Sequence, residues 1–212
     1  MDGIEGVCLM NNRWNKWVYR WWSPVYDHFF NKGPFLKARQ ELFNDVYFHE
    51  GDKVLFVGVG TGADLEQIPI DRLDITAIDY SEEMLAQAKK KFPTTSIFFQ
   101  QMDAQQLTLP DGAFDYVVAS LILSVVPDSH KSFEEMVRVT RSKGQMIIFD
   151  KFSSKSSLLK KLIRPVIKAL GTDIGLSFEK IYEKHSGEKL TLLENRAVLF
   201  GGMYRKIKIR KN

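Results

Sequence analysis

Short apolar runs alternate with longer amphipathic stretches from about residue 50 to the end of the chain. Five runs have the length of buried strands, at residues 54–57, 74–79, 96–102, 114–123 and 145–150. Helices are predicted at residues 34–48, 81–91, 130–140 and 173–184, and two further strand-like runs, 190–200 and 203–209, meet at a Gly-Gly pair that favours a hairpin. This order predicts an α/β fold with a mostly parallel sheet, helices on both faces and a terminal antiparallel hairpin.

The first apolar run leads into three glycines at alternate positions, Gly58, Gly60 and Gly62. Glycine adopts backbone angles that other residues avoid and lets a ligand approach the main chain closely. Residues 63–65 would then open a helix, whose free N–H groups favour an anionic ligand group. Strand, glycine turn and helix together predict a nucleotide-type binding site at the carboxyl end of a strand.

The second apolar run ends in Asp79, nineteen residues after Gly60. An acid at this spacing, at the tip of the next parallel strand, suits the two hydroxyl groups of a ribose. An ordinary acid in a turn at a strand end is the alternative interpretation. We favour the ribose because the glycine turn and the acid occur together in the strand–turn–helix context that the motif requires.

The glycine spacing G-x-G-x-G differs from the G-x-G-x-x-G of dinucleotide folds. With the run VLFVGVGTG and the acid of the second strand, it resembles the class I S-adenosylmethionine (SAM) methyltransferases, whose first motif is VL(E/D)xGxGxG. The resemblance implies a Rossmann-like, seven-stranded sheet, SAM as cofactor and S-adenosylhomocysteine as product. The family carries an acid where this chain has Phe56, and on that pattern we expect Phe56→Glu to be tolerated.

Family motifs carried onto this sequence imply a set of cofactor-binding residues. The methionine end of SAM is expected over the glycine turn, the ribose at Asp79 and the adenine near Tyr80, Asp103 and Ala104, with the tip of the fourth strand under the cofactor. The full set is Gly58, Gly60, Thr61, Gly62, Asp79, Tyr80, Met84, Asp103, Ala104, Ser120 and Leu121.

Three further segments resemble bacterial phospholipid N-methyltransferases: WSPVYD at residues 22–27, DKF at 150–152 and LGTDI at 170–174. A segment related to the first also occurs in ubiquinone and menaquinone C-methyltransferases. The resemblance places Tyr26 near the SAM methyl group, and His130 is a second candidate for catalysis. It implies a small-molecule or lipid acceptor, either an amino-phospholipid or a quinone-like compound.

Two basic amphipathic segments, residues 14–22 and 158–170, have an apolar face opposite Lys and Arg side chains. The first contains all four tryptophans, and residues 150–212 carry fifteen Lys and Arg against six Asp and Glu. Such segments are typical of an anionic membrane surface, and a lid over a soluble substrate is the alternative. We therefore divide the chain into a helical lid or membrane-facing segment, 1–50, and a methyltransferase domain, 51–212, with a helical insertion at about 153–185.

Other features of the chain bear on its location in the cell, its partners and its metal content. The single cysteine, Cys8, excludes an internal disulfide, and no signal peptide is visible, so we expect a cytoplasmic protein, or one peripheral on the inner membrane face. The fourth strand ends in SLILSVV rather than the N/D-P-P-Y/F of amino-group nucleic-acid methyltransferases, so no nucleic acid partner is expected. The His and Cys residues are scattered, which predicts no metal site.

Two other functional hypotheses stay open at this point. One is a nicotinamide oxidoreductase, against which the glycine spacing and the Asp103-Ala104 pair argue. The other is a SAM-binding adaptor without catalysis, which Phe56 keeps open. The sequence does not predict the oligomeric state.

Overall fold

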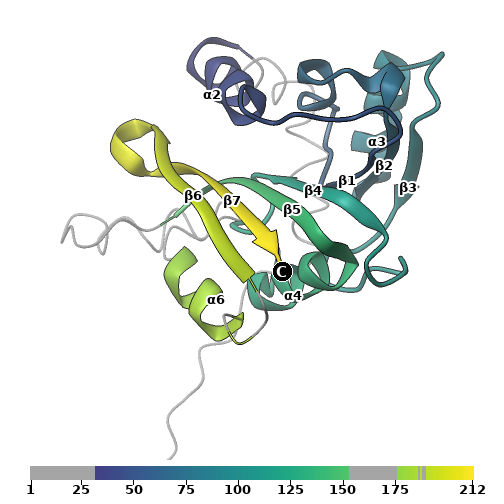
Figure 1. Ribbon diagram of the computed structural model, residues 1–212. Coiled ribbons are helices and arrows are strands. Elements are labelled where there is room, and N and C mark those ends of the chain that lie inside the picture. Colours follow the sequence, from purple (N-terminus) through teal and green to yellow (C-terminus); the bar gives the residue numbers. More distant parts are fainter. Residues whose placement is uncertain (1–31, 153–175, 186, 188–189) are drawn as a thin grey trace, which may run out of the picture.

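A computed structural model describes residues 32–152, 176–185, 187 and 190–212 (Figure 1). Tyr26, the tryptophan-rich segment and the second basic segment therefore lie outside the described residues, and the predictions for them stay predictions.

The core of the fold is a single seven-stranded sheet in the order β3-β2-β1-β4-β5-β7-β6. The first five strands run parallel to one another, β7 is antiparallel to β5, and β6 is antiparallel to β7. The strands are β1 (Lys53–Val57), β2 (Asp74–Asp79), β3 (Phe98–Gln101), β4 (Phe114–Ser120), β5 (Thr140–Lys151), β6 (Leu190–Leu199) and β7 (Tyr204–Lys211). This arrangement confirms the predicted fold class.

The described helices cover both faces of this sheet, with α2 and α3 above it and α4 and α6 below it in Figure 1. They are α2 (Gly33–Phe43), α3 (Glu82–Lys91), α4 (Ser129–Val139) and α6 (Phe178–His185), with 3-10 turns η1 (Leu65–Gln67), η2 (Ile70–Arg72) and η3 (Phe200–Gly202). Because side chains alternate along a strand, Val54 and Phe56 pack toward α2, whereas Leu55 and Val57 pack toward α4. Each face of the sheet thus has its own apolar core.

Several predicted boundaries were wrong. The α-helix expected at residues 63–65 does not form in the described chain, which makes only η1 and η2 there, since Pro69 lacks the N–H that a longer helix needs. The helix expected at residues 34–48 ends at Phe43. The fourth strand ends at Ser120, because Leu121 turns to a positive φ of 58°, and the fifth begins at Thr140.

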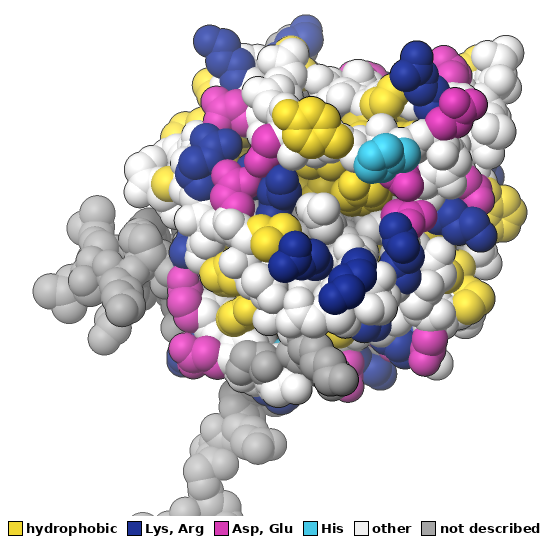
Figure 2. All heavy atoms as spheres, viewed as in Figure 1, with side chains coloured by type: hydrophobic (Ala, Val, Ile, Leu, Met, Phe, Trp, Pro, Cys, Tyr) yellow, Lys and Arg dark blue, Asp and Glu magenta, His cyan; other side chains and the backbone are white. Residues whose placement is uncertain are grey.

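Ion pairs join α2 and the turn that follows it to the terminal hairpin. The Lys206 ammonium, only 1% exposed, is paired with Asp45 and donates to the carbonyl oxygen of Glu41 at 3.1 Å. Lys208 pairs with the same Asp45 at 3.1 Å, and Arg196 with Glu41 at 3.1 Å. Acidic and basic side chains are accordingly interspersed on this face of the molecule (Figure 2). Part of the basic excess of the last third is therefore neutralised within the fold.

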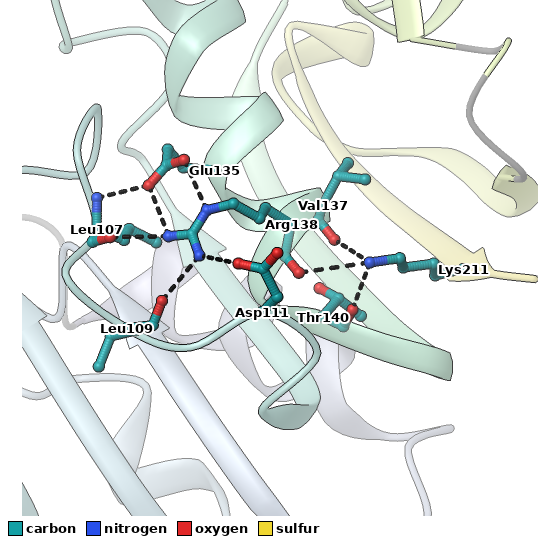
Figure 3. A network of polar contacts seen from close by, with 8 residues as sticks. All are labelled: Leu107, Leu109, Asp111, Glu135, Val137, Arg138, Thr140 and Lys211. Carbon is teal, nitrogen blue, oxygen red and sulfur yellow. Dashed lines mark hydrogen bonds and ion pairs between the residues drawn. The ribbon is translucent and has the colours of Figure 1, made fainter.

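A polar network closes the amino edge of the parallel sheet (Figure 3). The Arg138 guanidinium bonds Glu135 at 2.9 Å, Asp111 at 2.5 Å and two loop carbonyl oxygens. The Lys211 ammonium, at the end of β7, donates to carbonyl oxygens at the C-terminal end of α4, where its charge also favours the helix dipole. These contacts hold the end of the chain in place and leave the opposite, carboxyl edge for a binding site.

Candidate functional site

The three glycines after β1 fulfil different steric requirements. A Cβ at Gly58 would lie 2.7 Å from the Cδ1 atom of Ile122, and one at Gly62 would lie 2.8 Å from the Phe92 ring. Glycine at these two positions thus permits close packing. At Gly60, with φ +56°, no atom lies within 4 Å of the added Cβ. The middle glycine therefore faces open space, where the backbone is accessible to a ligand.

Asp79 stands at the end of β2 and is bonded to the glycine turn. Its Oδ2 atom accepts the N–H of Gly60 and its Oδ1 atom the N–H of Ser81, both at 2.8 Å. Burial raises the pKa of this half-buried carboxyl, and the backbone N–H groups of Ser81, Gly60 and Tyr80 oppose the shift. A carboxylate offers about four acceptor positions, so with these three donors Asp79 can still accept a bond from a hydroxyl group.

The neighbouring strand ends bring further predicted residues to the same edge. Ser81 caps α3 by accepting the N–H of Met84 at 3.2 Å, and the N–H of Met102 donates to the Asp79 carbonyl oxygen at 3.0 Å. That bond brings Asp103 and Ala104 beside the tip of β2. The Asp103 Oδ1 atom accepts the N–H of Gln105 at 2.9 Å, which orients the side chain. Tyr80 is 38% exposed and Ala104 is buried.

The tip of β4 completes this edge of the sheet. The Ser120 hydroxyl is buried with no hydrogen-bond partner among the described residues. Leu121 adopts a left-handed backbone, and its N–H donates to the Phe149 carbonyl oxygen at 2.7 Å. Thr61, in the glycine turn, is 2% exposed. The structure thus gathers all the predicted cofactor residues along the carboxyl ends of β1, β2, β3 and β4 and in the first turn of α3.

One charged contact at this edge was missed from the sequence, the pair formed by Arg39 and Asp64. Arg39 of α2 donates to Asp64, just after the glycine turn, at 2.5 Å, and the two residues are only 4% and 6% exposed. Asp150, at the end of β5, has no exposed surface. Neither Arg39 nor Asp64 belongs to the motif, and a charge inside a helical pattern normally indicates a solvent-facing position. Asp150 was visible in the sequence as the last residue of the apolar run 145–150 and the first residue of the DKF segment.

His130 lies in the first turn of α4, away from the glycine turn in sequence and on the face of the sheet that α6 covers. Its ring centroid is 6.1 Å from that of His185, and its Nδ1 atom is buried without a hydrogen-bond partner in the described chain. No interaction of the described residues joins His130 to the glycine turn. Its catalytic role, like that of Tyr26, stays a prediction.

The environment of Phe56 changes the expectation for that position. The side chain is 1% exposed and packs in the apolar core between β1 and α2, with Ala38, Leu42 and Phe43 in the same cluster. A glutamate would place a carboxylate in this cluster, and desolvating an unpaired charge is unfavourable. The structure therefore predicts that Phe56→Glu lowers the stability of the fold, contrary to the expectation from the family pattern.

None of the helices in the described parts of the chain combines the length and hydropathy that a bilayer-spanning segment needs. Nor do those parts bring three or more His, Cys, Asp or Glu side chains into a group that could hold a metal ion.

Comparison with known proteins gives consistent similarities. A model of the methyltransferase domain matches residues 55–148. The chain is 32% identical over 193 residues to a phosphatidylethanolamine N-methyltransferase of Cereibacter sphaeroides, covering 88% of this chain and 92% of that protein. It is 37% identical over 129 residues to a demethylmenaquinone methyltransferase of Renibacterium salmoninarum, covering 59% of this chain and 54% of the relative.

Among solved structures, the fold is similar to a Haloferax volcanii methyltransferase in complex with the Trm112 methyltransferase activator. The TM-score is 0.73 at 14% identity, over 95% of this chain and 98% of that one. At this identity the similarity concerns the fold alone.

Proposed function

We propose, from the premise that the chain belongs to the class I SAM-dependent methyltransferase family, that its acceptor is the amine of an amino-phospholipid. The similarity to a phosphatidylethanolamine N-methyltransferase across nearly the whole of both chains confirms the predicted family. The chain is therefore a SAM-dependent methyltransferase. This assignment disagrees with the two competing hypotheses. One was a nicotinamide oxidoreductase, and the other was a SAM-binding adaptor without catalysis.

The proposed cofactor site follows the carboxyl edge of the sheet. The open space over Gly60 would accommodate the methionine end, and the remaining acceptor position of Asp79 suits a ribose hydroxyl. Asp103 and Ala104 would meet the adenine, with Met84 and Tyr80 beside it. Gly58, Thr61 and Gly62 shape the turn, and Ser120 and Leu121 would lie under the reacting end. The unpartnered Ser120 hydroxyl fits a ligand group at that position.

The residues of this site have to position the reactants and exclude water. When bound, SAM supplies a methyl group on a sulfonium, and in-line displacement leaves a neutral thioether. Positioning of two reactants is the main contribution that a protein can make to such a step. An amine acceptor needs only to lose a proton, whereas a ring carbon or a phenol needs a base.

The choice of acceptor rests on one observation, which is that the phosphatidylethanolamine N-methyltransferase is matched over 92% of its length. The demethylmenaquinone methyltransferase is matched over 54% of its length. In the predicted domain organisation, the acceptor is bound by segments outside the methyltransferase domain that both relatives share with this chain. A relative that is matched along these segments as well is therefore the better guide to the acceptor. A quinone-like acceptor is the alternative that the experiment must separate.

Labelled SAM offered with vesicles tests the acceptor. We expect label in the lipid fraction with phosphatidylethanolamine vesicles, recovered by mass spectrometry as N-methylated phosphatidylethanolamine. Phosphatidylcholine is the matched control, because its nitrogen already carries three methyl groups and has no lone pair to react. Label in a demethylmenaquinone substrate and none in phosphatidylethanolamine would contradict the proposal.

We further propose that the basic segments within residues 1–50 and about 153–185 form the membrane-facing part of the enzyme, while α2 and α6 pack on the sheet. In support, the described residues next to both basic segments lie at one place. Phe35, in the first turn of α2, packs 5.3 Å from Tyr204, and Tyr204 pairs in register with Lys151, the last residue of β5. The described residues nearest in sequence to the two basic segments therefore lie at the carboxyl edge of the sheet, beside the proposed site.

Vesicle binding is expected to depend on salt. Each Lys or Arg near an anionic surface adds about 1 kcal/mol at low ionic strength, and salt screens this attraction. We expect co-sedimentation with phosphatidylglycerol vesicles at low salt, weaker binding as salt rises, and weaker binding by a Trp17→Ala/Trp21→Ala variant with unchanged SAM affinity. No sedimentation at low salt, with tryptophan emission unaffected by lipid, would instead indicate a lid over a soluble substrate.

A further inference from the structure

The loop after β4, residues 121–126, begins with a conformation that its sequence does not favour. Leu121 has a φ of 58°, in the left-handed region, where a side chain with a Cβ is disfavoured. Such a conformation persists only where surrounding contacts hold it. One of them is the bond from the Leu121 N–H to the Phe149 carbonyl oxygen of β5, at 2.7 Å.

The same loop packs directly against the glycine turn. The Ile122 side chain fills the space that a Cβ at Gly58 would need, with its Cδ1, Cγ1 and Cβ atoms 2.7, 3.0 and 3.2 Å from that position. No layer of side chains separates the loop from the turn at this point. A displacement of the loop would therefore act on the backbone of the turn itself, because packed interiors leave little free volume.

Asp150 attaches the second half of this loop to β5. Its Oδ2 atom accepts the N–H of Ser124 at 3.2 Å, its Oδ1 atom accepts the N–H of Lys151 at 2.7 Å, and the Ser124 hydroxyl is a further donor to it. Asp150 has no exposed surface and Ser124 is 3% exposed. A carboxylate buried so completely is unfavourable unless its hydrogen bonds are made.

Among the described residues, Lys151, Tyr204 and Arg205 are the titratable or charged groups beside Asp150. Burial raises the pKa of Asp150, and the bonds from Ser124 and the Lys151 N–H oppose the shift, together with the positive charge of Lys151. Tyr204 of β7 also faces it, and burial together with the charge of Asp150 raises the pKa of that phenol to about 12, so Tyr204 stays neutral. Arg205, opposite Asp150 in the strand register, is bonded to Glu179 of α6 at 2.7 Å.

We propose that Asp150 is a positioning residue for methyl transfer: its carboxylate clamps loop 121–126 to β5 and so fixes the floor of the reaction site under the glycine turn. This assignment rests on the proposed function, and it goes beyond the cofactor contacts. Asp79, at the end of β2, and Asp103, just after β3, would still hold the adenosyl part when the clamp is lost. Asp150 therefore acts on the rate of transfer and not on the affinity for SAM.

Asp150→Asn tests the clamp while keeping the side-chain shape. Methyl transfer to phosphatidylethanolamine should fall roughly 10- to 100-fold in kcat, since small misplacements of reactants have effects of this size. The KM for SAM should stay within about twofold of wild type. Asp115→Asn is the matched control: Asp115 accepts the backbone N–H of Lys53 at 2.8 Å at the amino edge of the sheet, so kcat should be unchanged.

The pH profile separates positioning from a purely structural role. As pH falls through the raised pKa of Asp150, one oxygen becomes an O–H group and stops accepting, so kcat should fall. A raised pKa also means that the folded state binds this proton more tightly than the unfolded state, so the protonation itself does not lower stability. The ratio of wild-type to Asp150→Asn kcat should therefore decrease on the acid side, and this ratio cancels the titration of the acceptor amine.

Hydrogen–deuterium exchange gives a readout that needs no acceptor. Amides of residues 121–126 should exchange faster in Asp150→Asn than in wild type, at an unchanged melting temperature. Unchanged exchange, an unchanged kcat, or a loss of kcat matched by a rise in the KM for SAM would each overturn the assignment. A wild-type protein that is inactive on phosphatidylethanolamine would count against the proposed acceptor alone, because the exchange result stands without it.

Discussion

Arg39→Met is expected to lower the free energy of unfolding by about 3–5 kcal/mol, the range measured when one member of a buried ion pair is removed. The substitution leaves the Asp64 carboxylate, 6% exposed, without its guanidinium partner directly after the glycine turn. The double variant Arg39→Met/Asp64→Leu should recover most of the loss, because two apolar side chains can replace a buried ion pair with little penalty.

Urea unfolding followed by circular dichroism measures this difference. Arg196→Met is the matched control, since Arg196 pairs with Glu41 at 3.1 Å and both side chains are nearly half exposed. Pairs of this kind contribute about 0–1 kcal/mol. If Arg39→Met and Arg196→Met were equally mild, the contact between α2 and the glycine turn would not be the structural support that its burial implies.

Gly60→Leu is expected to weaken SAM binding by roughly 100-fold or more, about 2.7 kcal/mol, while leaving a folded protein. The added Cβ meets no atom within 4 Å, so the side chain has room in the fold and occupies the space proposed for the methionine end. The positive φ of 56° adds a strain of about 1–2 kcal/mol to the folded state. Calorimetric titration of SAM and a melting curve would measure the two effects separately.

Gly112→Leu controls for that strain. Gly112 has a φ of +61°, and its nearest contact for an added Cβ is an ordinary 3.7 Å, at the amino edge of the sheet. Both variants should lose similar stability, and only Gly60→Leu should lose SAM. Equal SAM affinity in the two variants would show that the open space over Gly60 is not the cofactor site.

The sequence was sufficient to predict a mostly parallel sheet with a terminal antiparallel hairpin and the strand end at which Asp79 stands. Both follow from local rules: apolar runs make strands, Gly58, Gly60 and Gly62 mark a turn, and Asp79 ends the next apolar run. The order of the strands in the sheet was not predicted. Sequence reasoning could treat the three glycines only as a group. The structure distinguishes the two that permit packing from the one that faces open space.

Tertiary contacts decided the features that the sequence did not predict. The left-handed turn at Leu121 depends on the Phe149 carbonyl oxygen of another strand, which no local pattern encodes. The partner of Arg39 is 25 residues away along the chain. Phe56 departs from the family pattern, and its fit becomes visible only once α2 is seen packed against β1.

SAM titration into wild type, Asp79→Ala and Asp74→Ala tests the central claim, a SAM site at the carboxyl edge of the sheet, most directly. The two acids begin and end the same strand, β2, so Asp74 is a control at the opposite edge. We expect Asp79→Ala to weaken SAM by about 1.5–3 kcal/mol, roughly 10- to 150-fold, because its bonds to the ribose hydroxyls involve a charged group. Asp74→Ala should bind as wild type does. Wild-type affinity in Asp79→Ala, in a protein that remains folded, would contradict the account.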